Sequence, residues 1–232
     1  MTYMSSVLLF GMIWLFFYTR YSRLRSCSFL SGLFFLPAGF TQALFVPTYW
    51  NPNVMFKLFG LFDLESLFFA FFTGGIASVL YPVFFRCRIG AVPGATGRYF
   101  RHSFWLLPAL AAAVIVGTAL FTQLSLIRVA FALFSFGIIH MLIVRPDLRE
   151  VCLWGALLFL VTYSGVAVIT AMVVPQFVYS AWTAEPLFGL RILQIPVDEF
   201  VYAFLFGGLW STVYCGIFDC RFIKPGHGWG NR

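Results

Sequence analysis

The acidic residues of this sequence gather at two places. Only eight Asp and Glu occur among 232 residues, and four of them form two close pairs. Asp63 and Glu65 begin one long apolar run, and Asp198 and Glu199 begin another. A carboxyl group held among apolar side chains has a raised pKa, so it can keep and deliver a proton at neutral pH. The pairs are therefore candidates for acid–base chemistry.

The same positions also suit the ordinary start of a helix. The first turn of a helix has free backbone N–H groups and the positive end of the dipole, and both favour negative charge. Pro196 is expected at the first helical position, with Asp198 and Glu199 following it within the first turn. The residues alone leave two interpretations open, helix capping and catalysis.

Composition places these groups in a lipid environment. The chain is 61% apolar and 10% charged, where a soluble domain shows roughly 45–50% and about 25%. So few charges cannot cover the surface of a soluble protein of this size. A carboxylate at membrane depth is costly, which makes it a functional hypothesis by default.

Seven apolar runs are long enough to be transmembrane helices. A helix needs roughly 20 mainly apolar residues to cross the hydrocarbon core. The runs are continuous, without alternation of polar and apolar residues, which favours helices over strands. We therefore expect an all-α polytopic membrane protein forming a single membrane domain over residues 1–232. The predicted spans lie at about 4–19, 28–46, 62–85, 103–121, 125–144, 151–173 and 196–218.

Basic residues predict the direction of these spans. Twelve of the fifteen Lys and Arg follow the first, third, fifth and seventh runs. Cytoplasmic loops carry the excess of Lys and Arg, so we expect the N-terminus outside and the tail at 219–232 in the cytoplasm of a multi-pass cell (inner or cytoplasmic) membrane protein. The five cysteines lie near the same ends without C-x-x-C spacing. We expect them to be buried or interfacial thiols rather than disulfides or metal ligands.

The third and seventh runs repeat each other. A shift of 133 residues places the segment DLESLFFAFFTGGIASVLYPVFF, from Asp63, on PVDEFVYAFLFGGLWSTVYCGIF, from Pro196. Glu65 then falls on Asp198, which keeps the carboxylate. The two runs have the same direction, so we predict parallel repeats related by an axis along the membrane normal.

The repeat predicts three helices, one connecting helix and three more. The first unit covers about 4–85, the connecting helix about 103–121 and the second unit about 125–218. The shift of 133 also places Ser31-Gly32 on Ser164-Gly165. Sites in such proteins lie where the repeats meet, so we expect Glu65, Asp198 and Glu199 to share one apolar cavity near the outer leaflet.

Aromatic side chains crowd behind both acidic pairs. The sequence has 31 Phe, 10 Tyr and 7 Trp. Lipid-facing positions and interfacial belts, which include Tyr49 and Trp182, account for most of them. The sharper interpretation is a long apolar tunnel whose aromatic faces stabilise a cation. The candidates for substrate binding are then Phe68, Phe69, Phe72, Tyr202, Phe206 and Trp182.

Other polar groups are sparse. His140 lies in mid-span, and Gln42 and Tyr163 are candidates for the interior. The sequence contains no phosphate-binding glycine loop, no His/Cys ligand set and no lysine within a span, so nucleotide, metal and retinal chemistry are unsupported. The basic residues sit in short clusters between apolar runs, which indicates membrane orientation rather than nucleic-acid binding.

The segment IPVDEFVYAFLF resembles the P-x-E-E/D signature of the integral-membrane lycopene cyclase domain family. Pro196, Asp198 and Glu199 match the signature, whereas the first copy keeps Glu65 and has Ser66 at the fourth position. That family occurs as two small subunits or as a tandem fusion, and the length and duplication here resemble the fused form.

The resemblance implies a carotenoid cyclase that needs no cofactor and acts on a lipophilic polyene such as lycopene. Protonation of the terminal double bond gives a tertiary cation, an internal double bond attacks it, and loss of a proton completes the ring. The reaction is an isomerisation. The expected catalytic residues are Glu199 as the acid, with Asp198 and Glu65 as its base or partner.

Two other functions fit the same pattern. A small transporter also suits a parallel arrangement of three, one and three helices. A membrane protein that binds carotenoid or isoprenoid without catalysis is the third interpretation, since the first copy of the motif is degenerate. The sequence leaves the ring type, the number of ends processed and the oligomeric state open.

Overall fold

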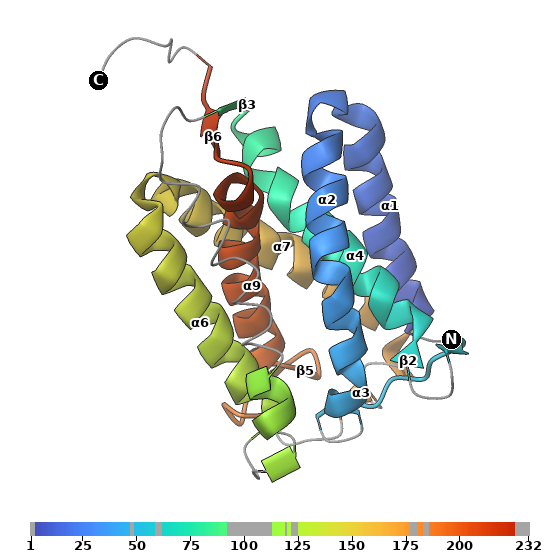
Figure 1. The fold of residues 1–232 in the computed structure, drawn as a ribbon. Helices are drawn as coiled ribbons and strands as arrows, with labels where there is room; N and C mark the ends of the chain where they lie inside the picture. The colour runs from blue at the N-terminus through green and yellow to red at the C-terminus, as the bar shows by residue number, and fades with distance from the viewer. Residues whose placement is uncertain are drawn as a thin grey trace.

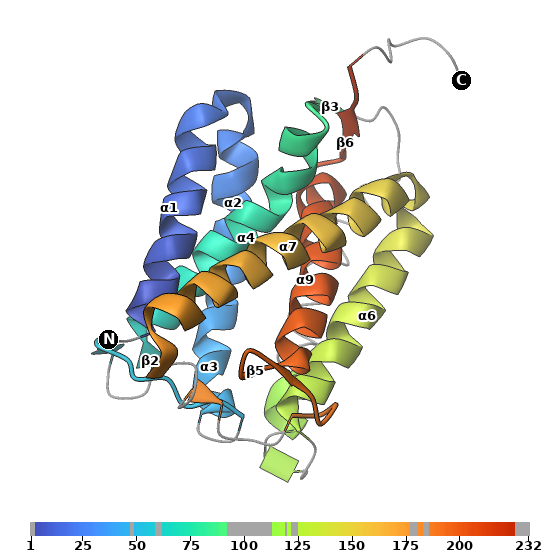
Figure 2. The ribbon, with the colours of Figure 1, turned by 180° about the vertical axis from the view of Figure 1, so that it is seen from behind.

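The computed structural model describes residues 3–46, 49–58, 62–91, 113–118, 120–121, 125–176, 181–182 and 186–225. Most of them form a bundle of long helices (Figures 1 and 2). The long helices are α1 (Met4–Arg20), α2 (Arg25–Phe35), α4 (Leu64–Phe84), α6 (Leu126–Val144), α7 (Arg149–Val173) and α9 (Val197–Ile217). Shorter turns are η1 (Ser22–Leu24), η2 (Leu36–Thr41), α3 (Gln42–Phe45) and η3 (Pro146–Leu148).

Six of the seven predicted spans correspond to helices in the described part of the chain. Five are long and apolar enough to cross a membrane, and α1, with 17 residues, is a shorter apolar helix. The second span is one continuous helical segment, Ser22–Phe45, in which η1, α2, η2 and α3 follow one another. The predicted connecting helix lies largely outside the described residues; its described parts, 113–118 and 120–121, are helical.

Helices α4 and α9 form the centre of the bundle. In their most apolar stretches 61% and 56% of the residues are buried, against 22–28% in the other long spans. The two helices contact each other; α4 also packs against α2 and α1, and α9 against α7 and α6. The carboxylate pairs predicted from the sequence thus begin the two most buried helices.

Glycines allow the close packing of these helices, as the paired Gly-Gly motifs predicted. A Cβ atom on Gly74 of α4 would lie 2.9 Å from the carbonyl oxygen of Ser31, and one on Gly207 of α9 would lie 2.9 Å from that of Gly155. The predicted equivalence of Ser31-Gly32 and Ser164-Gly165 is wrong. A Cβ on Gly32 would lie 2.5 Å from a backbone oxygen of α4, whereas one on Gly165 would meet nothing within 4 Å.

The two ends of the bundle differ in charge. Helices α1, α4, α6 and α9 run toward the end that carries the C-terminus, and α2 and α7 run back toward the end that carries the N-terminus (Figure 1). The arginine clusters after α1, α4, α6 and α9 therefore lie together at one end, and both acidic pairs lie at the opposite end.

In the described part of the chain, three short antiparallel ribbons depart from the all-α prediction. Strands β1 (Lys57–Leu58) and β2 (Phe62–Asp63) lead into α4, and β4 (Arg191–Ile192) and β5 (Ile195–Pro196) lead into α9. Pro196 is consequently the N-cap of α9 rather than its first helical residue. Strands β3 (Arg88–Ala91) and β6 (Cys220–Ile223) pair with each other and so join the ends of the two central helices.

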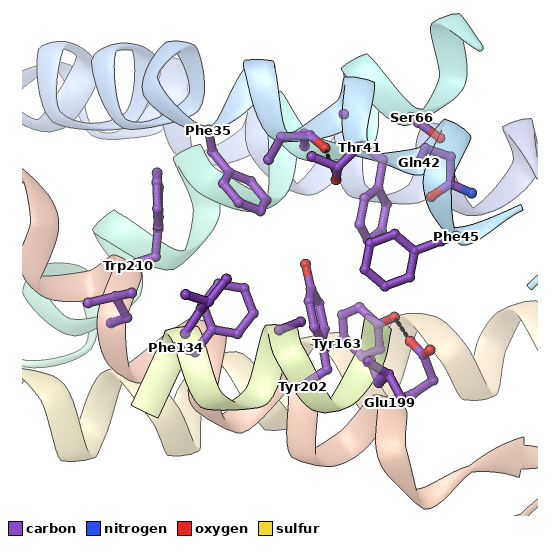
Figure 3. Close-up of a pocket in the computed structure, with 18 of the residues that line it drawn as sticks. Phe35, Thr41, Gln42, Phe45, Ser66, Phe134, Tyr163, Glu199, Tyr202 and Trp210 are labelled. Carbon is purple, nitrogen blue, oxygen red and sulfur yellow. Dashed lines mark hydrogen bonds between the residues drawn. The ribbon is translucent and has the colours of Figure 1, made fainter. Parts of the chain in front are cut away.

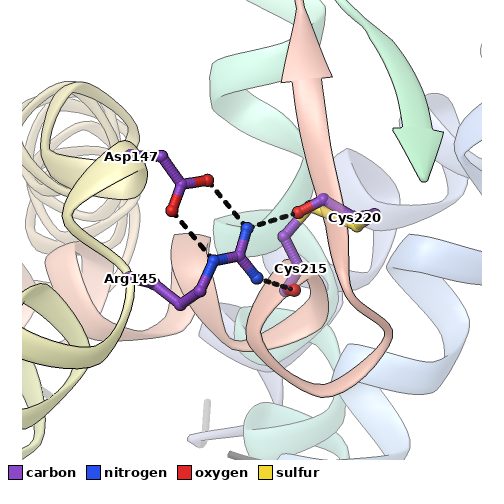
Figure 4. Close-up of polar contacts among 4 residues, drawn as sticks. All are labelled: Arg145, Asp147, Cys215 and Cys220. Atoms are coloured by element: carbon purple, nitrogen blue, oxygen red, sulfur yellow. Dashed lines mark hydrogen bonds and ion pairs between the residues drawn. A yellow bond between two sulfur atoms is a disulfide. The ribbon is translucent and has the colours of Figure 1, made fainter. Parts of the chain in front are cut away.

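Arg145 ties the end of α6 to the end of α9 (Figure 4). Its guanidinium group is buried, pairs with Asp147 at 2.8 Å, and donates to the carbonyl oxygens of Cys215 and Cys220 at 2.9 Å each. The carbonyl groups at the C-terminal end of a helix favour a cation, so the buried charge is compensated on both sides.

Cys215 and Cys220 form a disulfide, which corrects the expectation that all five cysteines are thiols. Helix α9 ends at Ile217, and Asp219 takes a positive φ of 51°. This turn brings the Cα atoms of the two cysteines to 4.4 Å. The remaining three, Cys27, Cys87 and Cys152, are buried thiols.

Candidate active site

A cavity of about 550 Å³ lies between the first and second halves of the chain (Figure 3). One wall comes from α1, α2, η2, α3 and α4 of the first half, and the facing wall from α6, α7 and α9. Its lining is mainly apolar. The described residues that line it include Tyr3, Gln42, Phe45, Tyr49, Trp50, Ser66, Phe69, Tyr163, Trp182, Glu199 and Tyr202.

Glu199 is the one acidic side chain among the described residues that line this cavity. It lies in the first turn of α9, where the helix dipole favours a negative charge. Its carboxylate accepts three hydrogen bonds: Oε1 from the Tyr49 hydroxyl and the Trp182 Nε1–H group, both at 3.0 Å, and Oε2 from the Tyr163 hydroxyl at 2.6 Å. These donors come from three separate segments, so tertiary structure fixes the position of the carboxylate.

The three donors differ in what they can do with a proton. The indole of Trp182 only donates. Burial raises the pKa of Tyr49, and the negative charge of Glu199 raises it further, so Tyr49 stays a phenol that donates to Oε1. Because two donors occupy Oε1, an acidic proton belongs on Oε2. There the hydroxyl of Tyr163 can accept as well as donate, and the hydrogen bond can reverse.

Asp198 and Glu65 lie elsewhere. Both are fully buried, and neither lines the cavity. Asp198 accepts the backbone N–H groups of Leu187 at 2.7 Å and Phe188 at 3.4 Å. Since successive residues of a helix are about 100° apart, Asp198 faces the preceding loop while Glu199 faces the cavity.

Glu65 takes the corresponding position on α4. Its Oε1 accepts the backbone N–H groups of Met55 at 2.6 Å and Phe56 at 3.3 Å. The expectation of one cavity shared by three carboxylates is therefore wrong for Glu65 and Asp198, which instead fix the loops that lead into α4 and α9. Ser66, the counterpart of Glu199, does line the cavity. Asp63 caps α4 by accepting the backbone N–H of Ser66 at 2.7 Å.

The aromatic residues predicted to bind substrate divide in the same way. Phe69, Tyr202 and Trp182 line the cavity. Phe206 is fully buried and packs between Phe35 and Phe159, beneath the wall. Phe68 is 42% exposed on the outer surface, where it stacks on Phe72.

The sequence pattern places Tyr49 in an interfacial belt only, and it places Trp182 both in that belt and among the substrate-binding candidates. In the structure both side chains donate a hydrogen bond to Glu199. The sequence does hold a signal for this position, because one tryptophan, Trp50 or Trp182, precedes each acidic pair. In the structure the rings of these two tryptophans lie side by side, with centroids 5.6 Å apart. His140, on α6, also lines the cavity.

The fold and site define a helical protein with the long apolar helices of a membrane protein, and its internal cavity presents one hydrogen-bonded carboxyl group among the described residues. Within this chain, residues 125–217 match the family model described as lycopene cyclase. The match covers α6, α7 and α9 and includes Asp198 and Glu199. No curated protein and no solved structure matches the chain.

The family match confirms the resemblance to the lycopene cyclase domain family over that segment. It supports a carotenoid-cyclase role in general terms, with a carotenoid as substrate and helices embedded in a membrane. The chemistry of the site agrees with that role, because a polyene offers no polar group and an apolar cavity suits it.

Proposed function

We propose that this protein is a carotenoid cyclase that closes a ring at the end of a lycopene-type polyene by proton-initiated isomerisation. The observation that carries the proposal is the position of Glu199. It is a carboxyl group fixed by three hydrogen bonds at the edge of an apolar cavity, inside the segment that matches the family.

In the proposed reaction Glu199 carries the proton on Oε2 and transfers it to the terminal double bond of the polyene. The resulting tertiary cation is attacked by an internal double bond, which forms the carbon–carbon bond of the ring. The ring cation then loses a proton, and the carboxylate of Glu199 takes it up. One proton enters and one leaves, so the product is an isomer of the substrate.

The surroundings support both charged states of this cycle. After proton transfer the carboxylate keeps its hydrogen bonds from Tyr49, Trp182 and Tyr163, and hydrogen bonds to a charged group are worth about 1.5–3 kcal/mol each. The cation lies among aromatic faces, Phe69 and Tyr202 among them, which stabilise positive charge through their quadrupoles. Asp198 and Glu65 contribute by fixing the entry loops.

The proposed architecture around this site is seven spans, with two units of three helices and one connecting helix. Four findings support the repeat. Helices α4 and α9 keep a shift of 133 residues from first to last residue, and each is followed by a residue with positive φ, Arg86 and Asp219. In each half a ribbon precedes the helix, and a buried carboxylate binds the loop before it.

The outer helices follow a different shift. Ser31 and Gly155 make the same close approach to α4 and α9, and the ring pair Phe10–Phe69 at 5.4 Å corresponds to Phe134–Tyr202 at 5.6 Å. From residue 31 to 155 the shift is 124. The shift of 133 that aligns the third helices therefore does not align the first two. The reason is that the loop between the second and third helices is longer in the second unit than in the first.

The test is to supply lycopene in liposomes to the purified protein and to separate the products by chromatography and mass. A product with the mass of lycopene and the absorption of a cyclised end supports the proposal. Bound lycopene that is recovered unchanged identifies a binding protein instead. Movement of a polar solute into the liposomes, with no carotenoid bound, identifies a transporter.

A further inference from the structure

A polar group lies across the cavity from the acid. Figure 3 shows Gln42 and Ser66 on the wall of the first half, opposite Tyr163 and Glu199 of the second half. The amide of Gln42 is therefore placed beside the space in which a cation would form.

The side-chain nitrogen of Gln42 is buried and has no hydrogen-bond partner among the described residues. Its neighbour Thr41 does not serve it, because the Thr41 hydroxyl donates to the carbonyl oxygen of Ala38 at 2.6 Å. Buried donors nearly always have a partner, and in a polar, roomy site that partner is ordered water. A water molecule takes about 30 Å³, which a cavity of about 550 Å³ accommodates beside an apolar chain end.

A second polar group, the hydroxyl of Tyr202, points into the same space as Gln42. The hydroxyl of Tyr202 projects toward the middle of the cavity in Figure 3, and its ring is fixed against Phe206 in a parallel stack with centroids 5.8 Å apart. Gln42 and Tyr202 thus face the cavity from opposite walls, and together they supply the donors and acceptors that a bound water needs.

We propose that Gln42 binds a water molecule that captures the cation in competition with ring closure, so that the protein also hydrates the terminal double bond of the polyene. Glu199 transfers a proton to the terminal carbon, the water oxygen forms a bond to the tertiary cation, and the proton that this water loses returns to the carboxylate. The net change is the addition of one water, without oxidation or reduction. The inference rests on the proposed function, because it uses the same acid and the same cation.

The experiment supplies lycopene in liposomes to the purified protein in heavy-oxygen water. The cyclised product has the mass of lycopene, whereas the hydrated product is an open-chain tertiary alcohol that carries the label. Gln42→Leu removes the amide with little change in volume. Thr162→Val is the matched control, since that hydroxyl donates to its own helix at Leu158 and lies outside the cavity lining.

We expect the wild-type protein to give both products, and Gln42→Leu to lower the ratio of labelled alcohol to ring product about tenfold, as for the loss of one hydrogen bond. Thr162→Val should leave the ratio unchanged. A wild-type protein that forms rings but no labelled alcohol overturns the inference and leaves the cyclase standing, as does an unchanged ratio in Gln42→Leu. Labelled alcohol without ring product overturns the cyclase and supports the water site, and the absence of both products overturns both.

Discussion

Asp198 and Glu199 are neighbours in the sequence, yet they face different surroundings. One accepts backbone N–H groups of the preceding loop, and the other faces the cavity and is held by side chains 17, 36 and 150 residues away. The sequence marked both residues as candidates for function, because carboxylates are rare in so apolar a chain. It could not predict which acid faces the cavity, since that depends on the direction in which α9 leaves its loop.

The first prediction concerns the acid itself. Glu199→Gln keeps the shape and removes the proton, so ring formation should fall by about 10²–10⁴-fold per folded molecule. The measurement is cyclised product per milligram of folded protein. The matched control is Glu150→Gln, at the opposite end of the bundle, where Glu150 pairs with Lys224 on the surface. Near-normal turnover of Glu199→Gln would show that the carboxyl group only caps the helix.

The second prediction concerns Tyr163. Tyr163→Phe leaves Oε2 of Glu199 without its partner at 2.6 Å. Since a hydrogen bond to a charged group is worth about 1.5–3 kcal/mol, the rate should fall about 10–100-fold. The measurement is the rate of ring formation per folded molecule of Tyr163→Phe. Tyr18→Phe is the matched control, because the ring of Tyr18 stacks on Trp14 of α1, outside the cavity lining. Equal rates for the two variants contradict a role for the hydroxyl.

At the scale of elements, continuous apolar runs made six helices predictable to within a few residues. The ribbons were not predictable, because strands of two to four residues are too short to show a period. The partner of each glycine was equally hidden. Gly32, Gly165 and Gly207 all lie within apolar runs, so the sequence does not distinguish them. In the structure Gly32 and Gly207 contact other helices, whereas a Cβ on Gly165 would meet nothing within 4 Å.

The third prediction uses that difference. A Cβ on Gly207 would lie 2.5 Å from Cβ of Phe159, so Gly207→Ala must push α7 away from α9. We expect a loss of about 1–3 kcal/mol, as for other overpacked sites, measured as a lower unfolding midpoint in detergent. Gly165→Ala meets nothing within 4 Å and should be neutral or stabilising. If both variants unfold at the same midpoint, α7 and α9 do not pack this closely.

The fourth prediction concerns the loop before α9. Asp198→Asn removes the charge and one of the two acceptor oxygens that bind Leu187 and Phe188. Loss of a buried acceptor should cost about 1–3 kcal/mol and increase proteolysis within residues 186–194. Turnover per folded molecule should change much less than in Glu199→Gln. A loss of turnover as large as in Glu199→Gln, with stability unchanged, would instead assign proton transfer to Asp198.

At the scale of the whole molecule, the arrangement of charge is the feature that the sequence predicted best. Arginines cluster after alternate spans, and the structure places those segments at one end of the bundle (Figure 1). The cavity, by contrast, needs both halves of the chain, so no local pattern could have located its walls.

The fifth prediction is the orientation of the bundle. With the basic end in the cytoplasm, reporter domains fused after Arg23, Tyr99 and Asp147 should all report the cytoplasm, and fusions after Asn51 and Arg191 should report the outside. Enzymatic reporters that are active on only one side of the membrane make the measurement. One outside signal in the first group overturns the charge-based orientation.

The ribbon between β3 and β6 has a consequence for how the chain is made. Residues 88–91 leave the ribosome more than a hundred residues before their partners at 220–223. The first three helices therefore enter the bilayer with one strand unpaired and one face of α4 uncovered. That face of α4 is covered only after α9 has been synthesised, and α9 is also the helix that contains Glu199. Biogenesis thus couples completion of the bundle to arrival of the acid, so a prematurely terminated chain lacks both.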